Sequence, residues 1–118
     1  MPQIRGLRFL CLLAIVASSS ALSADRMRFW NLTGETIATL YLAPAGTAAW
    51  GSNQCANDPD GSVSTDERLE LKGVSPGRYD VKFTDVKGRI CTVKDVTLVA
   101  GKSYAFSLTE ADLKDCVK

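Results

Sequence analysis

The stretch RYDVKFTD at residues 78–85 alternates apolar and polar side chains with a period of two. Tyr79, Val81 and Phe83 share one face and the polar residues share the other, which is the pattern of a strand with one buried side. The pair Lys87-Gly88 follows, and a second β-forming segment begins at Ile90. Because glycine favours tight turns between strands, the stretch predicts an antiparallel hairpin at the centre of the fold.

β-Forming residues bounded by turn signals recur along the rest of the chain. Further strands are expected at 27–32, 36–42, 68–72, 90–93, 96–99 and 103–108. The turn Thr33-Gly34-Glu35 suggests that the first two of these form a hairpin. Thr109 can cap a short helix over 110–115. About seven short strands predict a mainly β fold, a small antiparallel β-sandwich with a short C-terminal helix.

The apolar positions of these strands form the expected core. It contains Phe29, Ile37, Leu40, Leu42, Leu69, Leu71, Tyr79, Val81, Phe83, Ile90, Val93, Val96, Leu98, Tyr104, Phe106 and Leu108.

Residues 1–23 have the pattern of a secretory signal peptide. Arg5 and Arg8 precede an apolar run at 9–17, and small residues follow it. The run is too short to cross a bilayer as a helix. We therefore expect cleavage after Ser23, with Ala21 and Ala24 as alternative cleavage positions, a periplasmic or secreted protein, and a single domain over 24–118. An uncleaved N-terminal anchor is the alternative.

Composition restricts the function classes. The 118 residues include no His, which excludes Ser-His-Asp and Cys-His catalysis and all His-containing metal sites. Cleavage would lower the basic residues from 14 to 12 against 13 acidic ones, a net charge of −1. A near-neutral domain gives no electrostatic basis for binding nucleic acid or anionic lipid. We expect no catalytic residue, no nucleic-acid partner and, after cleavage, no membrane partner.

Three cysteines would remain in an oxidising compartment: Cys55, Cys91 and Cys116. Three thiols form at most one internal disulfide. Cys91–Cys116 is the favoured pair, because it ties the last residues to a central strand and closes a loop of about 25 residues, worth about 3 kcal/mol. Pairing of Cys55 with either of the other two remains open.

Residues 44–66 contain turn residues without periodicity. Loops of this length in small domains are usually functional or loosely ordered. The acidic part, 56–67, can be aligned with a twelve-residue calcium loop, with Gly61 at the sharp turn. Its candidate ligands are Asp58, Asp60, Ser64 and Glu67. Ala56 at the first ligand position departs from that pattern, and a solvated turn is the alternative.

Trp50 stands in the middle of the same loop. Tryptophan is common at the energetic centres of protein interfaces, so Trp50 and the neighbouring Asn53 are candidate binding-surface residues. The alternative for Trp50 is that it folds back over the core.

Three segments resemble a group of small secreted proteobacterial proteins without an assigned function: LYLAPAG at 40–46, WGSNQ at 50–54 and GRYDVKF at 77–83. The resemblance covers about residues 29–116. The stretch SPGRYDV at 75–81 is also similar to transthyretin-like or carboxypeptidase-regulatory β-sandwich modules, in which a Pro-Gly turn leads into a Tyr-bearing strand. These resemblances imply a β-sandwich outside the cytoplasm, and neither implies a catalytic residue.

Two functions follow from these features. The first is an exported binding module that contacts a protein partner through the 44–66 loop or through an open sheet edge, which can accept an added strand. The second is a structural domain without a separate ligand, stabilised by calcium in the acidic loop.

Overall fold

The computed structural model describes residues 26–118, so the expected signal peptide at 1–23 lies outside the described residues. The described chain is mainly β, as predicted, with seven strands in two sheets. One sheet has the order β3-β1-β6 and the other the order β2-β4-β5-β7. The strands are β1 (Arg28–Leu32), β2 (Ile37–Pro44), β3 (Arg68–Glu70), β4 (Gly77–Asp85), β5 (Ile90–Leu98), β6 (Phe106–Thr109) and β7 (Cys116–Val117).

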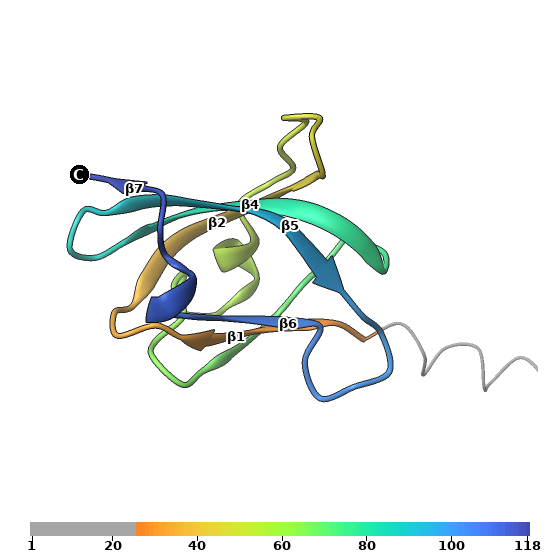
Figure 1. Cartoon of the computed structure of the whole chain (residues 1–118). Helices are drawn as coiled ribbons and strands as arrows, with labels where there is room; N and C mark the ends of the chain where they lie inside the picture. The colour runs from red at the N-terminus through yellow and green to blue at the C-terminus, as the bar shows by residue number, and fades with distance from the viewer. Residues whose placement is uncertain (1–25) are drawn as a thin grey trace, which may run out of the picture.

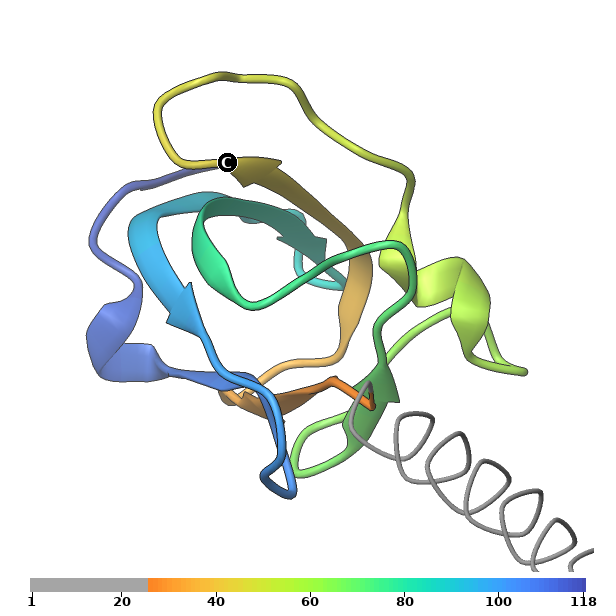
Figure 2. The same cartoon turned by 90° about the vertical axis from the view of Figure 1, so that its right-hand side faces the viewer.

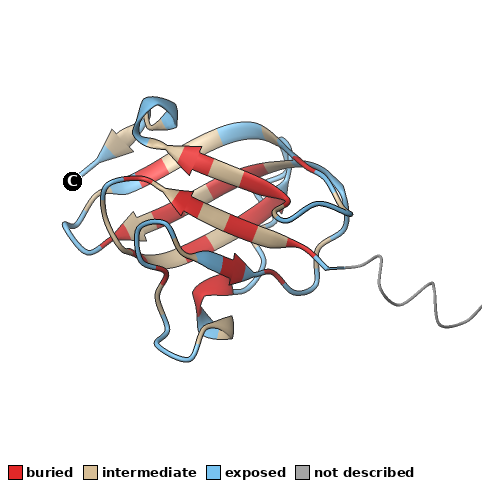
Figure 3. Ribbon diagram, turned by 90° about the horizontal axis from the view of Figure 1, so that it is seen from below, coloured by how far each residue is buried: buried red, intermediate tan, exposed pale blue. Residues whose placement is uncertain are grey.

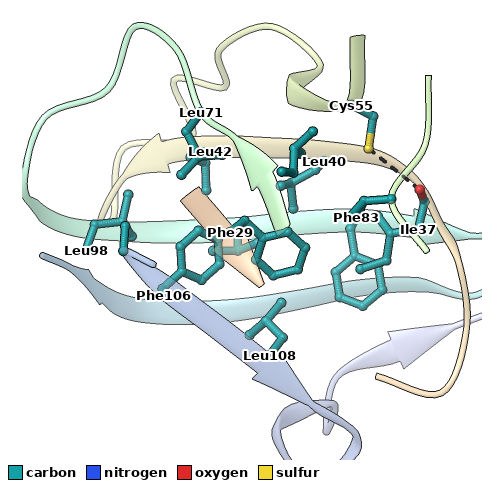
Figure 4. Packing of buried hydrophobic residues seen from close by; sticks show 14 of the residues in the cluster. Phe29, Ile37, Leu40, Leu42, Cys55, Leu71, Phe83, Leu98, Phe106 and Leu108 are labelled. Carbon is teal, nitrogen blue, oxygen red and sulfur yellow. Dashed lines mark hydrogen bonds between the residues drawn. The ribbon is translucent and has the colours of Figure 1, made fainter. Parts of the chain in front are cut away.

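One hydrophobic cluster contains residues of both sheets. Figure 1 shows β2, β4 and β5 above β1 and β6. Figure 3 shows buried positions alternating with less buried ones along the strands, as the period-two pattern requires. Phe29 and Phe106 from one sheet lie with Leu40 and Phe83 from the other in the centre of the cluster (Figure 4).

The central hairpin predicted from RYDVKFTD is confirmed. β4 pairs with β5 in antiparallel register, with Phe83 opposite Cys91. Val81 and Phe83 are fully buried, as the alternation predicted. Gly88 closes the turn with a φ of 88°, a conformation that glycine adopts without steric cost.

The expected hairpin between the first two strands is wrong. β1 pairs with β3 in antiparallel and with β6 in parallel orientation, whereas β2 pairs with β4 in the other sheet. The chain crosses between the sheets after Leu32, and buried Asn31 holds this crossing. Its amide nitrogen donates to the carbonyl oxygens of Glu35 and Val63, both at 3.0 Å. A turn sequence predicts that the chain reverses direction, but it does not predict which strands pair with each other.

The segments 90–93 and 96–99, expected as two strands, form the single strand β5 with an irregularity in its pairing to β4. Asp95 stands there with a φ of 61°, and its N–H donates to the carboxylate of Asp80 at 3.0 Å. Ile90 was expected in the core but is 42% exposed, because it faces away from the cluster. Tyr104 also lies outside the cluster, where its ring centroid is 5.2 Å from that of Trp30.

The expected C-terminal helix is also wrong. Only a 3₁₀ turn, η3 (Glu110–Asp112), follows β6, although the capping box of Thr109 and Asp112 is formed. The chain must then return to β5, where Cys116 pairs with Cys91. The two are joined by a disulfide with a Cα–Cα distance of 4.1 Å, so the favoured cysteine pairing is confirmed. This return leaves no room for a longer helix.

Candidate binding groove

The long loop at 44–66 covers the free edge of β2. Ile37 and Val63 exchange both main-chain hydrogen bonds at 2.9 Å, and the N–H of Gly51 donates to the carbonyl of Leu42 at 2.9 Å. The N–H of Leu40 donates to the side-chain oxygen of Asn53 at 3.0 Å. These bonds occupy main-chain groups that would otherwise be open to another strand. Much of the loop therefore has a structural role.

The two candidate binding-surface residues of this loop have different roles in the structure. The side-chain oxygen of Asn53 accepts from Leu40 and also from the N–H of Cys55, where it caps the 3₁₀ turn η2 (Gln54–Asn57). Asn53 thus positions the loop. Trp50 is half-buried, and the Lys82 ammonium lies 4.6 Å from its ring centroid. Lys82 alternates with the buried Val81 and Phe83 along β4, so Trp50 packs on the outer face of the sheet and not over the core.

Gln54 joins the loop to the connection between β3 and β4. Its side-chain nitrogen donates to the carbonyl of Lys72, and its side-chain oxygen accepts from the N–H of the same residue, both at 2.9 Å. Asn57 donates to that oxygen at 2.8 Å. Gln54 is buried, and every polar atom of its amide has a partner. A glutamine inside an aperiodic loop gives no sequence signal for such a role, and sequence reasoning missed it.

Tyr79 makes a similar pair of hydrogen bonds to the same connection, and we call each of the two pairs a clamp. Its hydroxyl donates to the carbonyl of Ser75 at 2.9 Å and accepts from the N–H of Ser75 at 3.2 Å. The sequence places Tyr79 on the core face of β4, and its ring does pack against the core cluster. Its hydroxyl, however, extends beyond the core cluster to the main chain of Ser75. The connection is therefore held at Lys72 by Gln54 and at Ser75 by Tyr79.

Two adjoining hollows flank this connection. One, of about 370 Å³, is lined by Met27, Leu71, Val74, Ser75, Pro76 and Ala100. The other, of about 270 Å³, is lined by Leu42, Pro44, Ala49, Gly51, Ser52 and Tyr79. Gly73 and Val74 belong to both, and we call the pair of hollows the groove. In Figure 2 the green connection from β3 to β4 crosses the end of the molecule that faces the viewer.

The candidate calcium ligands have partners within their own turns. The carboxylate of Asp58 accepts from the N–H of Asp60 at 2.8 Å, and that of Glu67 accepts from the N–H of Ser64 at 2.7 Å. Within residues 26–118 no three acidic or thiol side chains converge in a way that could hold a metal ion. Asp58 and Glu67, two of the candidate calcium ligands, thus use a carboxylate oxygen to close their own turns.

The remaining thiol, Cys55, is fully buried. Its Sγ lies 3.7 Å from the carbonyl oxygen of Ile37, the dashed contact in Figure 4. Burial, with a smaller contribution from the charge of Asp58, raises the pKa of this thiol to about 11. A neutral buried thiol is a poor nucleophile, so Cys55 acts as part of the core.

Several charged side chains form local networks. Arg89 donates to the carboxylates of Asp85 at 2.8 Å and Glu110 at 3.1 Å, which links the hairpin turn to η3. Hydrogen bonds from Arg89 and from the N–H of Gly34 lower the pKa of Glu110. The pKa of Asp80 is lowered by the N–H groups of Gly46 and Asp95.

The described part of the chain, 26–118, contains no helix long and apolar enough to cross a membrane. Compared with known proteins, the chain matches no family model, no curated protein and no solved structure.

Proposed function

We propose that this protein is an exported, non-catalytic binding module that holds a segment of a partner protein in the groove. The observation that carries the proposal is the groove itself: two adjoining hollows at one end of the molecule, on either side of Gly73 and Val74. One hollow is lined in part by residues of the long loop, namely Pro44, Ala49, Gly51, Ser52 and Gln54. Ligands usually bind at concave sites.

The rigidity of the groove supports the same function. In the connection between β3 and β4, Gln54 bonds both main-chain groups of Lys72. Tyr79 bonds both main-chain groups of Ser75. A surface that is already ordered loses little conformational entropy when a partner binds. We infer that the two sheets, which share one core cluster, pack as a β-sandwich with the groove across one end.

Export is the setting that fits this protein best. The leader pattern at 1–23 supports it, as does the resemblance to small exported proteobacterial proteins. The disulfide Cys91–Cys116 supports it independently, because structural disulfides persist in the periplasm and in the medium and are rare in the cytosol. The groove requires no cofactor in this function.

The absence of histidine from the sequence supports a binding function over a catalytic one. The carboxyl groups with shifted pKa values lie in ion pairs and turns, namely Asp80, Asp85, Asp95 and Glu110. In each of them the pKa is lowered, whereas a general acid working near neutral pH needs a raised pKa.

Site-specific photo-crosslinking in producing cells tests this function. A photoreactive side chain at Ser52, an exposed residue that lines the groove, is compared with one at Ser64, an exposed residue of the same loop outside it. The proposal predicts discrete protein adducts from position 52 and none of these from position 64. Identical adduct patterns from the two positions, or no adduct from position 52 in any envelope fraction, would contradict it.

A further inference from the structure

The two residues between the clamps have unused main-chain groups. Neither the N–H nor the C=O of Gly73 or Val74 makes a hydrogen bond to any other residue of 26–118. The flanking residues Lys72 and Ser75, by contrast, have both groups paired to side chains. The contrast marks a short segment whose position is fixed but whose peptide groups remain available.

The conformation of this segment depends on glycine. Gly73 has a φ of 73°, in the left-handed region that other residues rarely adopt. Apart from its two chain neighbours, no residue has a heavy atom within 4 Å of the position that a Cβ would occupy there, so crowding does not explain the glycine. The backbone turn explains it, and this turn carries the peptide groups of Gly73 and Val74 between the two hollows.

Unpaired peptide groups beside a hollow are complementary to the peptide groups of an extended chain. Strand-like recognition uses main-chain hydrogen bonds for affinity and pockets for alternate side chains for specificity. The two hollows share Gly73 and Val74, and the surface that they expose is more polar than apolar. A chain that crosses Gly73 and Val74 can therefore direct one side chain into each hollow.

We propose that Gly73 and Val74 form a main-chain recognition site for an extended polypeptide segment of the partner, with short side chains of that segment in the two hollows. This inference rests on the proposed function and adds to it the chemical class of the bound segment. Peptide groups, not a charged head group, are what the site recognises.

The open edge of β5 fits such a segment less well. Among residues 26–118, β7 pairs only with Ile90 and Cys91, and no other described strand lies on that side of β5. The pairing irregularity at Asp95 and the exposed Lys94 interrupt this edge. Bulges and lysines are the features that protect sheet edges from added strands. The edge of β2 is covered by the loop at 44–66.

A backbone-sensitive titration tests the inference. The ¹⁵N-labelled protein is titrated with an acetylated and amidated peptide of alternating threonine and valine, and with the same peptide N-methylated at alternate residues. N-methylation removes donors and keeps the side chains. We expect saturable shifts of the Gly73, Val74 and Tyr79 amide signals with the first peptide. The second should bind at least about tenfold more weakly, because two hydrogen bonds of ordinary strength are lost.

Val74→Pro removes the free N–H from the protein side, and Ser62→Pro is its matched control. Gly61, which precedes Ser62, has a φ of 74°, so both prolines follow a left-handed glycine. Val74→Thr keeps the shape and the N–H. We expect Val74→Pro to lose peptide binding, and Ser62→Pro and Val74→Thr to keep it. If Val74→Pro does not fold, the N-methylated peptide still decides the question.

The outcomes separate this inference from the function on which it rests. Equal affinity for the methylated and unmethylated peptides, or shifts confined to β5, would overturn the main-chain site and leave groove binding intact. Adducts at Ser52 that persist in Val74→Pro would do the same. If the protein with the photoreactive group at position 52 and no other change gave no adducts, the proposed function itself would be overturned.

Discussion

The side-chain amide of Gln54 lies against the peptide groups of Lys72 in a double hydrogen bond, with both distances 2.9 Å. This is the exchange that two paired residues of neighbouring strands make, with a side chain in place of one strand. It fixes the connection between the two sheets where no strand is present. The position of the groove follows from this contact.

Gln54→Ala should therefore destabilise the fold more than a loop substitution usually does. It removes both bonds to Lys72 and leaves Asn57 without one acceptor. We expect a loss of about 2 kcal/mol in the free energy of unfolding, since three part-buried hydrogen bonds are lost together. Urea denaturation of Gln54→Ala and of the exposed neighbour Ser52→Ala measures this. A loss no larger than that of Ser52→Ala would show that the clamp is dispensable.

The disulfide should carry a large share of the stability. Replacement of both Cys91 and Cys116 by alanine opens a loop with a sequence separation of 25. Chain-entropy arguments give a loss of about 3 kcal/mol for a loop of this size. Thermal unfolding of the double variant against the parent protein measures it. An unchanged melting temperature would mean that the pairing of β7 with β5 holds without the covalent link.

Cys55 should resist thiol reagents in the native state. Its burial and its raised pKa of about 11 both suppress the reactive thiolate. In a protein that begins at residue 24, we expect no thiol to react at pH 8 without denaturant and one to react in guanidinium without reductant. Fast labelling of the folded protein would contradict the buried position.

Acid should destabilise the protein through Asp85. Burial raises its pKa, but hydrogen bonds from Arg89 and from the N–H of Lys87 outweigh this, so the folded-state pKa is lowered. A lowered pKa contributes stability above the unfolded value, about 3.9, which is lost as the pH falls through the folded-state value. Urea denaturation from pH 7 to pH 3 should show this decline.

Asp85→Asn should flatten the acid limb of that profile. Asp95→Asn is the matched comparison, because the pKa of Asp95 is also lowered, by its hydrogen bonds with Arg78, but that pair is exposed. We expect the smaller effect from Asp95→Asn, since water screens exposed ion pairs. Equal slopes for Asp85→Asn and the parent protein would remove Asp85 as the source.

Calcium should have little effect on stability if turn closure is the role of the acidic loop. We expect 5 mM calcium to shift the melting temperature by less than about 1 °C relative to a chelator, since only a ligand bound to the native state stabilises it. A clear rise that Asp58→Asn and Asp60→Asn abolish would instead support the calcium-stabilised domain.

The sequence predicted the elements whose determinants are local. The alternation through Tyr79, Val81 and Phe83, the turn at Gly88 and the closing disulfide are all present. The pairing of β1 with β3 and β6 could not be predicted from the sequence, because it depends on which distant strands share a core. The helix expected after Thr109 was wrong because pairing of Cys116 with Cys91 overrides a weak local preference.

The groove could be predicted only in part. The sequence predicts a long aperiodic loop at 44–66, and five of its residues line one hollow. The residues that shape the groove are Gln54 and Tyr79, whose roles depend on partners 18 and 4 positions away that are brought close by the fold. Trp50, an aromatic residue in a loop, is predicted as a binding-surface residue, but it packs against Lys82 and does not line the groove.

Amide hydrogen exchange at Gly73 and Val74, measured in the free protein and in its complex with the crosslinked partner, tests the binding site most directly. Both amides should exchange rapidly in the free protein, because they have no hydrogen-bond acceptor among residues 26–118. In the complex both should slow by at least about tenfold. Exchange that is equally fast in the two states would contradict recognition of the partner by this segment.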